Sequence, residues 1–164
     1  MSKKLSAILA VLMVALFAFF AIASSSDGEK TEQDAGKADA QNADSNVGEY
    51  SVDIKSARLS ESWDGKDVVV ITYGFTNNSD DSASFGVAFE DNAYQNGVGL
   101  ERAYTLKDGD PYDDGNQYKD IKTGATLDVE VPYVLNDTET DVEVEVEELF
   151  GLNDDMVTRT FSIK

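Results

Sequence analysis

Cysteine and histidine are both absent from this 164-residue sequence. Without cysteine the chain can form no disulfide, offers no thiolate nucleophile, and cannot carry the lipid that bacterial lipoproteins attach to a cysteine. Without histidine it lacks the commonest general base and the commonest transition-metal ligand. Ser-His-Asp catalysis, Cys-His catalysis and zinc sites with nitrogen and sulfur ligands are therefore excluded.

Basic residues are scarce. The chain has 13 Lys and Arg against 32 Asp and Glu, which gives a formal net charge of −19. Nucleic-acid binding depends on cationic contacts with phosphates, and anionic lipid surfaces attract basic segments. We therefore expect no nucleic-acid partner and no electrostatic attraction to anionic headgroups.

A long apolar run occupies residues 5–23, directly after Lys3 and Lys4. The positive start, the apolar stretch and the small residues at 21–23 are typical of a secretory signal peptide. The run also approaches the roughly 20 residues of a membrane span, so a retained anchor through residues 5–23 is the alternative. A buried core helix is the third interpretation, but nothing nearby would bury it. In the first two cases the positive-inside rule places the rest of the chain outside the cell, secreted or at its surface.

The next segment, residues 24–49, is polar. It has no aromatic residue, and Val47 is its only β-branched aliphatic residue. Such a composition buries too little apolar area to offset the entropy of ordering. We predict a disordered polar linker over 24–49 and a folded domain over 50–164.

From Tyr50 onward, short β-rich runs alternate with clusters of Gly, Asn and Asp, and no helical periodicity persists. The run from 68 to 75 is apolar on both faces, which predicts a central strand. Asn96-Gly97 predicts a tight hairpin. Further strands are predicted over 50–59, 83–91, 118–121, 127–135, 141–150 and 156–164. The pattern favours an all-β domain of about seven strands in two antiparallel sheets packed as a β-sandwich, preceded by the apolar N-terminal helix.

Two of these strands carry additional signals. Pro132 cannot donate a hydrogen bond to a neighbouring strand, so either 127–135 lies at a sheet edge or Pro132 stands where no donor is required. Glu148 breaks the alternation of 141–150, which predicts a bulge that returns Leu149-Phe150 to the apolar face.

Residues 68–104 and 121–151 resemble an uncharacterised family of immunoglobulin-like domains from Gram-positive exported proteins and lipoproteins. The resemblance rests on Phe75-Thr-Asn-Asn-Ser79, on the Tyr94-Gln-Asn-Gly97 hairpin and on the Lys122-Thr-Gly124 turn, in this order. It implies an immunoglobulin-like sandwich, similar in fold to a small secreted mycobacterial-type antigen, and no enzymatic activity is established for this family. Members commonly carry a lipoprotein cysteine before a Ser-rich linker. Here Ser24 stands at that point, so lipid anchoring is not expected.

The acidic loop at residues 108–115 contains four aspartates. Calcium takes about six to eight oxygen ligands, so the loop is a candidate calcium site. However, Tyr112 and Lys119 occupy two of the ligand positions of an EF-hand spacing. We favour a solvated acidic loop over a metal site.

Glu143, Glu145 and Glu147 alternate with valines, as Asp128 and Glu130 do on an earlier strand. If they share one sheet face, the stripe could dock a cationic partner. The simpler interpretation is a solvated face whose charges discourage edge pairing.

Trp63, beside a turn, is either an exposed recognition anchor or, as we expect, a cover over the open end of the sandwich. Paired carboxylates about 5–9.5 Å apart could hydrolyse glycosides, but no insertion that would form a cleft is visible. We predict an exported, non-enzymatic domain that binds an unknown protein or cell-envelope partner, with no catalytic, cofactor-binding or metal residues. The alternatives are a calcium-dependent accessory module and a small carboxylate-based hydrolase.

Overall fold

The computed structural model describes residues 45–151 and 155–164; the predicted signal or anchor at 1–23 lies outside them. The described part contains eight strands, one four-residue α-helix and one five-residue 3₁₀ helix. In chain order the elements are β1 (Ser45–Val47), β2 (Tyr50–Glu61), β3 (Asp67–Asn77), α1 (Phe85–Ala88), β4 (Phe89–Gln95), β5 (Val98–Gly99), η1 (Asp114–Tyr118), β6 (Thr126–Val134), β7 (Val142–Glu148) and β8 (Met156–Phe161).

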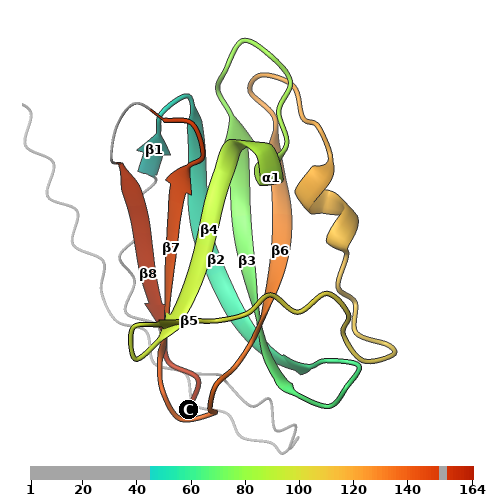
Figure 1. The fold of residues 1–164 in the computed structure, drawn as a ribbon. Coiled ribbons are helices and arrows are strands. Elements are labelled where there is room, and N and C mark those ends of the chain that lie inside the picture. Colours follow the sequence, from blue (N-terminus) through green and yellow to red (C-terminus); the bar gives the residue numbers. More distant parts are fainter. Residues whose placement is uncertain (1–44, 152–154) are drawn as a thin grey trace, which may run out of the picture. The chain divides into compact units, whose positions relative to one another are not determined.

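The strands form two four-stranded sheets, in the orders β1-β2-β3-β6 and β5-β4-β7-β8. Every neighbouring pair is antiparallel. In Figure 1 the sheet that contains β4, β7 and β8 lies in front of the sheet that contains β2, β3 and β6. The prediction of an all-β domain with two antiparallel sheets is therefore confirmed.

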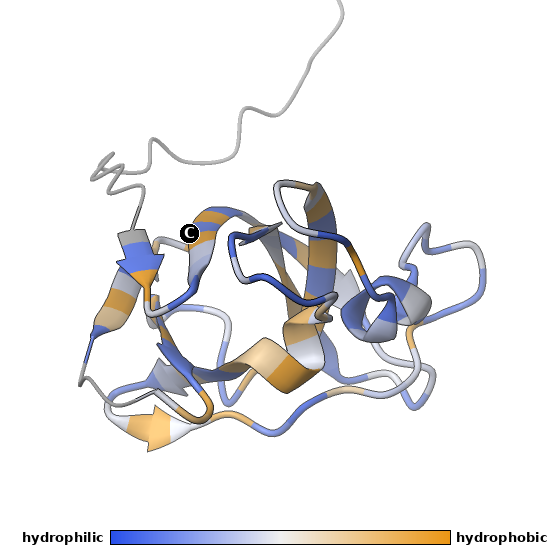
Figure 2. Cartoon of the chain, turned by 90° about the horizontal axis from the view of Figure 1, so that it is seen from above, coloured by the Kyte–Doolittle hydropathy of each residue, from blue (hydrophilic) through white to orange (hydrophobic). Residues whose placement is uncertain are grey.

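Side chains from both sheets meet in one hydrophobic cluster. The alternation that predicted the strands is visible as blue and orange bands along the ribbons in Figure 2. On β7, for example, Val142, Val144 and Val146 are fully buried while Glu143 and Glu147 are exposed. A fully buried valine side chain contributes about 1.5–3 kcal/mol relative to an exposed one, so this alternation fixes which face of each strand points inward.

The central strand β3 is buried on both faces, as predicted. Ile71 and Phe75 belong to the main core, while Val68 and Val70 pack with Ala103 in a second, smaller cluster on the opposite face. The segment after β5 thus covers Val68 and Val70 on the outer side of this sheet, which explains why these two positions of β3 are apolar.

The predicted boundary between linker and domain is wrong. β1 lies inside the segment 24–49 that was predicted to be disordered, and it pairs with the start of β2. Val47 is 1% exposed and belongs to the main core. Gly48, with φ of +63°, forms the turn between the two strands. The buried Val47 and the left-handed turn at Gly48 hold residues 45–47 against β2.

The strand predicted over 83–91 is a second error. The chain forms α1 first, and only Phe89 starts the strand. Phe85 and Ala88 are buried at helical spacing, whereas Val87 is 61% exposed instead of sharing their face. The helix places the Phe85 ring against three other core rings, those of Tyr73, Phe75 and Phe89. This aromatic packing outweighs the local alternation.

Two smaller strand predictions also differ from the structure. The segment 118–121 is not a strand; Ile121 alone forms a bridge, with Ala83. No bulge follows Glu148, because β7 ends there and Phe150 is 82% exposed.

The irregularity lies in β2 instead, between Ile54 and Ser56. There Arg159 donates hydrogen bonds to the carbonyls of Ile54 and Lys55 and so ties β8 to the other sheet. The prediction that Pro132 marks an edge strand is confirmed, since β6 is the last strand of its sheet.

Within residues 45–151 and 155–164, the structure contains no helix with the length and apolar character needed to cross a membrane.

Candidate functional site

The segment that follows β5 leaves its sheet and runs along β6 (Figure 1). Arg102 forms an antiparallel bridge with Tyr133, and the Ala103 N–H donates to the Pro132 carbonyl over 2.9 Å. Further on, the Lys107 N–H donates to the Glu61 carbonyl. The segment is therefore held at both ends by backbone hydrogen bonds, and the loop between them has a defined position.

This segment and η1 enclose two adjacent hollows, of about 70 Å³ and about 210 Å³. Both are lined by Tyr104, Tyr112 and Asp114, so they lie side by side, and we call the pair the tyrosine trough. The smaller hollow is completed by residues of β6, η1 and the loop: Arg102, Ala103, Gln117, Tyr118, Val131 and Pro132. The larger one is completed by loop residues only: Thr105, Leu106, Lys107 and Asp110.

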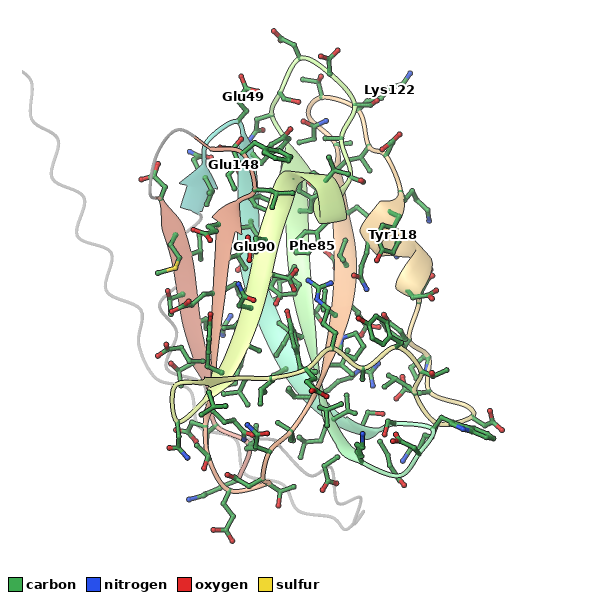
Figure 3. The ribbon with its side chains drawn as sticks, viewed as in Figure 1. Glu49, Phe85, Glu90, Tyr118, Lys122 and Glu148 are labelled. Carbon is green, nitrogen blue, oxygen red and sulfur yellow. The ribbon has the colours of Figure 1, made fainter. Side chains whose placement is uncertain are left out.

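Aromatic side chains at the trough are unusually open to solvent. Tyr104 is 85% exposed and Tyr118 is 71% exposed. Tyr118 projects from η1 beside β6 in Figure 3. Trp63 is 73% exposed, and its backbone N–H donates to the carbonyl of Thr105, a residue of the larger hollow. The expectation that Trp63 covers the end of the domain is therefore wrong.

A buried polar network supports the smaller hollow from below. The carboxylate of Asp91, on β4, accepts hydrogen bonds from Arg102 and from the hydroxyl of Tyr133. The Asp91 side chain is 1% exposed. Burial raises the pKa of Asp91, although Arg102 and Tyr133 pull it the other way. Burial also raises the pKa of the Tyr133 hydroxyl. Because three elements share this network, it fixes the position of Arg102 under the trough.

Gln117 links η1 to β6 beneath the smaller hollow. Its side-chain amide donates to the Tyr112 hydroxyl over 3.0 Å and to the Glu130 carbonyl over 2.9 Å. Burial, with the nearby charge of Asp114, raises the pKa of Tyr112 to about 12. The Tyr112 phenol is thus protonated at neutral pH and still has its own proton to donate.

Asp110, on the wall of the larger hollow, is occupied by protein partners. Its oxygens accept from both terminal nitrogens of Arg58, at 2.9 and 2.8 Å, and from the Ser60 hydroxyl at 2.5 Å. Hydrogen bonding to Arg58 lowers the pKa of Asp110 to about 2. A carboxylate held in this way is not available to protonate a substrate or to bind a cation.

The other aspartates of residues 108–115 do not support the calcium hypothesis either. Asp113 accepts a hydrogen bond from the Gly115 N–H at the start of η1. In the part of the chain that the structure describes, no three acidic residues are grouped so that they could hold a metal ion. Asp108, Asp113 and Asp114 are exposed, as expected for a solvated acidic loop, and Asp110 alone anchors the loop to the wall of the trough.

The acidic stripe predicted on one face is divided between the two sheets. Asp128 and Glu130 lie on β6, where they pair with Lys55 and Arg58 at 2.5 and 3.3 Å. The glutamates at 143, 145 and 147 lie on β7 of the other sheet. Their actual neighbour is Glu90 on β4, directly opposite Glu147. We call these four glutamates the acidic face.

The sequence analysis considered Asp110, Tyr112 and Asp114 only as parts of the acidic loop 108–115, and it did not identify Tyr104 or Tyr118. One signal was present: three of the chain's seven tyrosines fall within residues 104–118, a stretch predicted mostly as loop. Aromatic residues in a loop are either buried in the core or exposed, and exposed ones can indicate a binding surface. Arg102, Gln117 and Asp91 gave no such signal, because their roles depend on contacts across the fold.

Comparisons with known proteins agree with the fold. A solved structure of a "putative lipoprotein" from Staphylococcus aureus subsp. aureus NCTC 8325 is 18% identical to this chain, covers 70% of it and 84% of its own length, and superimposes with a TM-score of 0.53. At this identity the likeness concerns the fold alone. No curated protein shows significant similarity. The family model described as "Domain of unknown function (DUF5067)" matches residues 24–148. Because this match spans well over half of the 164 residues, the chain belongs to that family of domains of unknown function.

Proposed function

We propose that the protein is an exported, non-catalytic domain that acts by binding, in the bacterial cell envelope or in the secreted fraction. Three observations support export: the signal-like residues 1–23, the family match that begins at residue 24, and the name of the similar staphylococcal protein. Since Ser24 cannot carry a lipid on a thioether, the exported chain is either free or held through residues 5–23.

We further propose that the domain is an immunoglobulin-like β-sandwich. In such domains one sheet contains strands A, B and E, and the other contains C, F and G, to which C′ can be added. The order β2-β3-β6 corresponds to A-B-E, and the order β5-β4-β7-β8 corresponds to C′-C-F-G. The inter-sheet disulfide of antibody domains has no counterpart here, because the chain lacks cysteine.

The observation that carries the binding function is the tyrosine trough. It presents aromatic rings to solvent on a backbone held by hydrogen bonds, and tyrosine and arginine are the residues that most often dominate binding surfaces. Its chemistry does not favour catalysis. Asp110 is tied to Arg58 and Asp91 is buried under Arg102, which leaves Asp114 as the one carboxylate of the trough outside any described hydrogen bond or ion pair. Acid–base hydrolysis of a glycoside requires two.

Export is tested by fractionating a bacterial host that makes the full chain and sequencing the N-terminus of the product. A chain that starts at Ser24 in the medium indicates secretion, and an intact Met1 in the membrane fraction indicates an anchor. Accumulation in the cytoplasm would contradict the proposal.

Binding is tested by measuring retention of the full chain on isolated envelope material from Gram-positive cells. The double change Tyr104→Ala with Tyr118→Ala should abolish retention, because it removes the two most exposed rings of the trough. Tyr94→Ala, on the acidic face, is the matched control and should bind normally. Replacing Glu143, Glu145 and Glu147 by Gln tests the alternative surface; loss of retention only in that variant would move the site to the acidic face.

A further inference from the structure

We infer that the tyrosine trough binds a neutral saccharide chain of more than one sugar unit. The inference rests on the proposed binding function and adds the chemical class of the ligand. A pyranose ring has an apolar face of C–H groups, which packs on an aromatic ring, and a rim of hydroxyls, which both donate and accept hydrogen bonds. A matching site must supply exposed rings next to unoccupied polar groups.

The exposed rings are held on an ordered backbone. Tyr104 follows directly after Ala103, whose N–H is bonded to the Pro132 carbonyl. Tyr118 ends η1, which is capped by Asp113 and packs on β6. Tyrosine has few rotatable bonds, so placing it on fixed backbone offers contact area at low entropic cost. The rings are therefore prepared for stacking without being used in the core.

Unoccupied polar groups lie among these rings. Within residues 45–151 and 155–164, the Asp114 carboxylate and the hydroxyls of Tyr104 and Tyr118 take part in no hydrogen bond or ion pair between side chains. The Tyr112 hydroxyl accepts from Gln117 and retains its proton. The trough thus combines acceptors with donors, which is what sugar hydroxyls require.

The size of the hollows favours a ligand that lies across them. At about 70 and 210 Å³ they are smaller than the roughly 300–1,000 Å³ of pockets that enclose a drug-sized molecule. The wall shared by Tyr104, Tyr112 and Asp114 separates two adjacent positions along one surface. Such a surface suits consecutive units of a chain better than one isolated molecule.

Charge argues against ionic ligands. Residues 101–120 contain six acidic and three basic side chains, which disfavours an anion. Arg102, the cation at the floor, is already engaged by Asp91 and Gln117. A basic partner is expected to prefer the acidic face, because that surface offers four glutamates, whereas the trough offers only the unengaged carboxylate of Asp114. A neutral ligand is what remains.

The test uses the full chain, calorimetry and a panel of soluble oligosaccharides: one to four units of N-acetylglucosamine, glucose, mannose or galactose. At least one series should bind saturably, with Kd falling about tenfold or more from one unit to three. Emission from Trp63, the chain's only tryptophan, should change with the same Kd, because Trp63 is hydrogen-bonded to Thr105 beside the trough.

Variants locate the site. Tyr118→Ala should weaken oligosaccharide binding about tenfold, in line with the loss of one stacked ring, while Tyr118→Phe should stay within about threefold. Tyr94→Ala should bind as the unchanged protein does. If Tyr118→Ala and Tyr104→Ala both bind the oligosaccharide as tightly as the unchanged protein does, the inference is wrong, because the saccharide then binds elsewhere.

Two further probes, polygalacturonate and hexalysine, separate neutral from charged ligands. Binding of either at the trough, with no binding of the neutral panel, would overturn the inference. If no saccharide binds but retention on envelope material is still lost with Tyr104→Ala and Tyr118→Ala, the ligand class is wrong and the binding function stands. If retention is also unaffected by those changes, both proposals fail.

Discussion

At the scale of single residues, Asp91 and Asp110 show how surroundings give the same side chain opposite ionisation behaviour. Both are nearly inaccessible, with side chains 1% and 6% exposed, and both pair with an arginine. Arg58 binds Asp110 with two terminal nitrogens and Ser60 adds a third hydrogen bond, which lowers its pKa to about 2. At Asp91 the cost of burial is larger than the gain from Arg102, so its pKa is raised. Asp110 holds a loop as a stable anion, whereas the ionised form of Asp91 is disfavoured by its burial.

We predict that Asp110→Asn destabilises the protein at neutral pH by about 1 kcal/mol, with solvent screening at Arg58 taken into account. Because the folded-state pKa of about 2 lies below the ordinary aspartate value of 3.8, the carboxylate stabilises the fold above pH 3.8. That contribution is lost as the pH falls through the folded-state pKa. Urea unfolding at pH 7 and near pH 2 measures the effect, and the difference from the unchanged protein should be much smaller at the lower pH, where the carboxylate is about half protonated.

Asp108→Asn is the control for this prediction, since Asp108 lies in the same loop and is exposed. It should leave the free energy of unfolding unchanged at both pH values. An equal loss in the two variants would show that the Arg58 pair does not stabilise the loop.

Two core tyrosines, Tyr73 and Tyr133, provide an opposed pair of changes. The Tyr73 hydroxyl is buried without a hydrogen-bond partner in the described residues, whereas the Tyr133 hydroxyl donates to Asp91. Tyr73→Phe removes an unsatisfied polar atom and should be neutral or stabilising by up to about 1 kcal/mol. Tyr133→Phe leaves the Asp91 carboxylate with one partner fewer and should cost about 1.5–3 kcal/mol.

Thermal unfolding of the two variants under identical conditions measures these two changes in stability. Each removes one hydroxyl from a ring of the same size, so the cavity effects are matched. Destabilisation by Tyr73→Phe as large as that by Tyr133→Phe would show that Tyr73 does have a partner.

At the scale of the elements, short segments close the two sheets. β1 is three residues long and adds one strand to the edge beside β2. The two-residue hairpin between β4 and β5 turns at Asn96 and Gly97, both with positive φ. Arg159 reaches from β8 to the irregularity in β2. β1, β5 and the Arg159 side chain each form hydrogen bonds with backbone groups that would otherwise stay unpaired at a sheet edge.

We predict that Val47→Ala destabilises the domain by about 1–2 kcal/mol, because it removes two buried methyl groups from a side chain that is 1% exposed. Glu49→Ala, in the adjacent exposed turn, should have no effect. Urea unfolding of both variants measures this. An unchanged midpoint for Val47→Ala would mean that residues 45–47 do not belong to the folded domain in solution.

At the scale of the whole molecule, the net charge of −19 makes electrostatic repulsion within the chain the main feature. Acidic side chains lie opposite one another across strands, as Glu90 and Glu147 do. Like charges in directly opposite positions destabilise a sheet by a few tenths of a kcal/mol or more. The fold therefore tolerates self-repulsion that favours solubility and disfavours anionic partners.

We predict that added salt stabilises the protein. Raising sodium chloride from about 10 mM to about 300 mM shortens the Debye length several-fold, and the melting temperature should rise by a few degrees. Glu147→Lys, which replaces repulsion from Glu90 by attraction, should melt higher at low salt and gain less from added salt. A larger salt response in this variant than in the unchanged chain would contradict the explanation.

Parts of the fold followed from local patterns. The valines of β7, the two apolar faces of β3, the Asn96-Gly97 hairpin and the edge position of Pro132 were all predicted. Each is set by neighbours within a few residues: a strand alternates with a period of two, a turn needs positive φ, and proline lacks an N–H. The prediction of a strand over 83–91 used the same patterns and failed, because the rings of Tyr73, Phe75 and Phe89 pack against Phe85. The predicted bulge after Glu148 also failed, since β7 ends there and Phe150 stays exposed.

The amino-acid sequence by itself determined the β class, the division of each strand into inner and outer faces, and the chemistry that the chain cannot perform without cysteine and histidine. The tertiary structure alone decided which charges are paired, that residues 45–47 join the domain, and that tyrosines from one loop gather beside β6 over the Asp91–Arg102 pair. The reason is physical: alternation and turn geometry are properties of adjacent residues, whereas burial and ion pairing depend on which distant segment lies opposite.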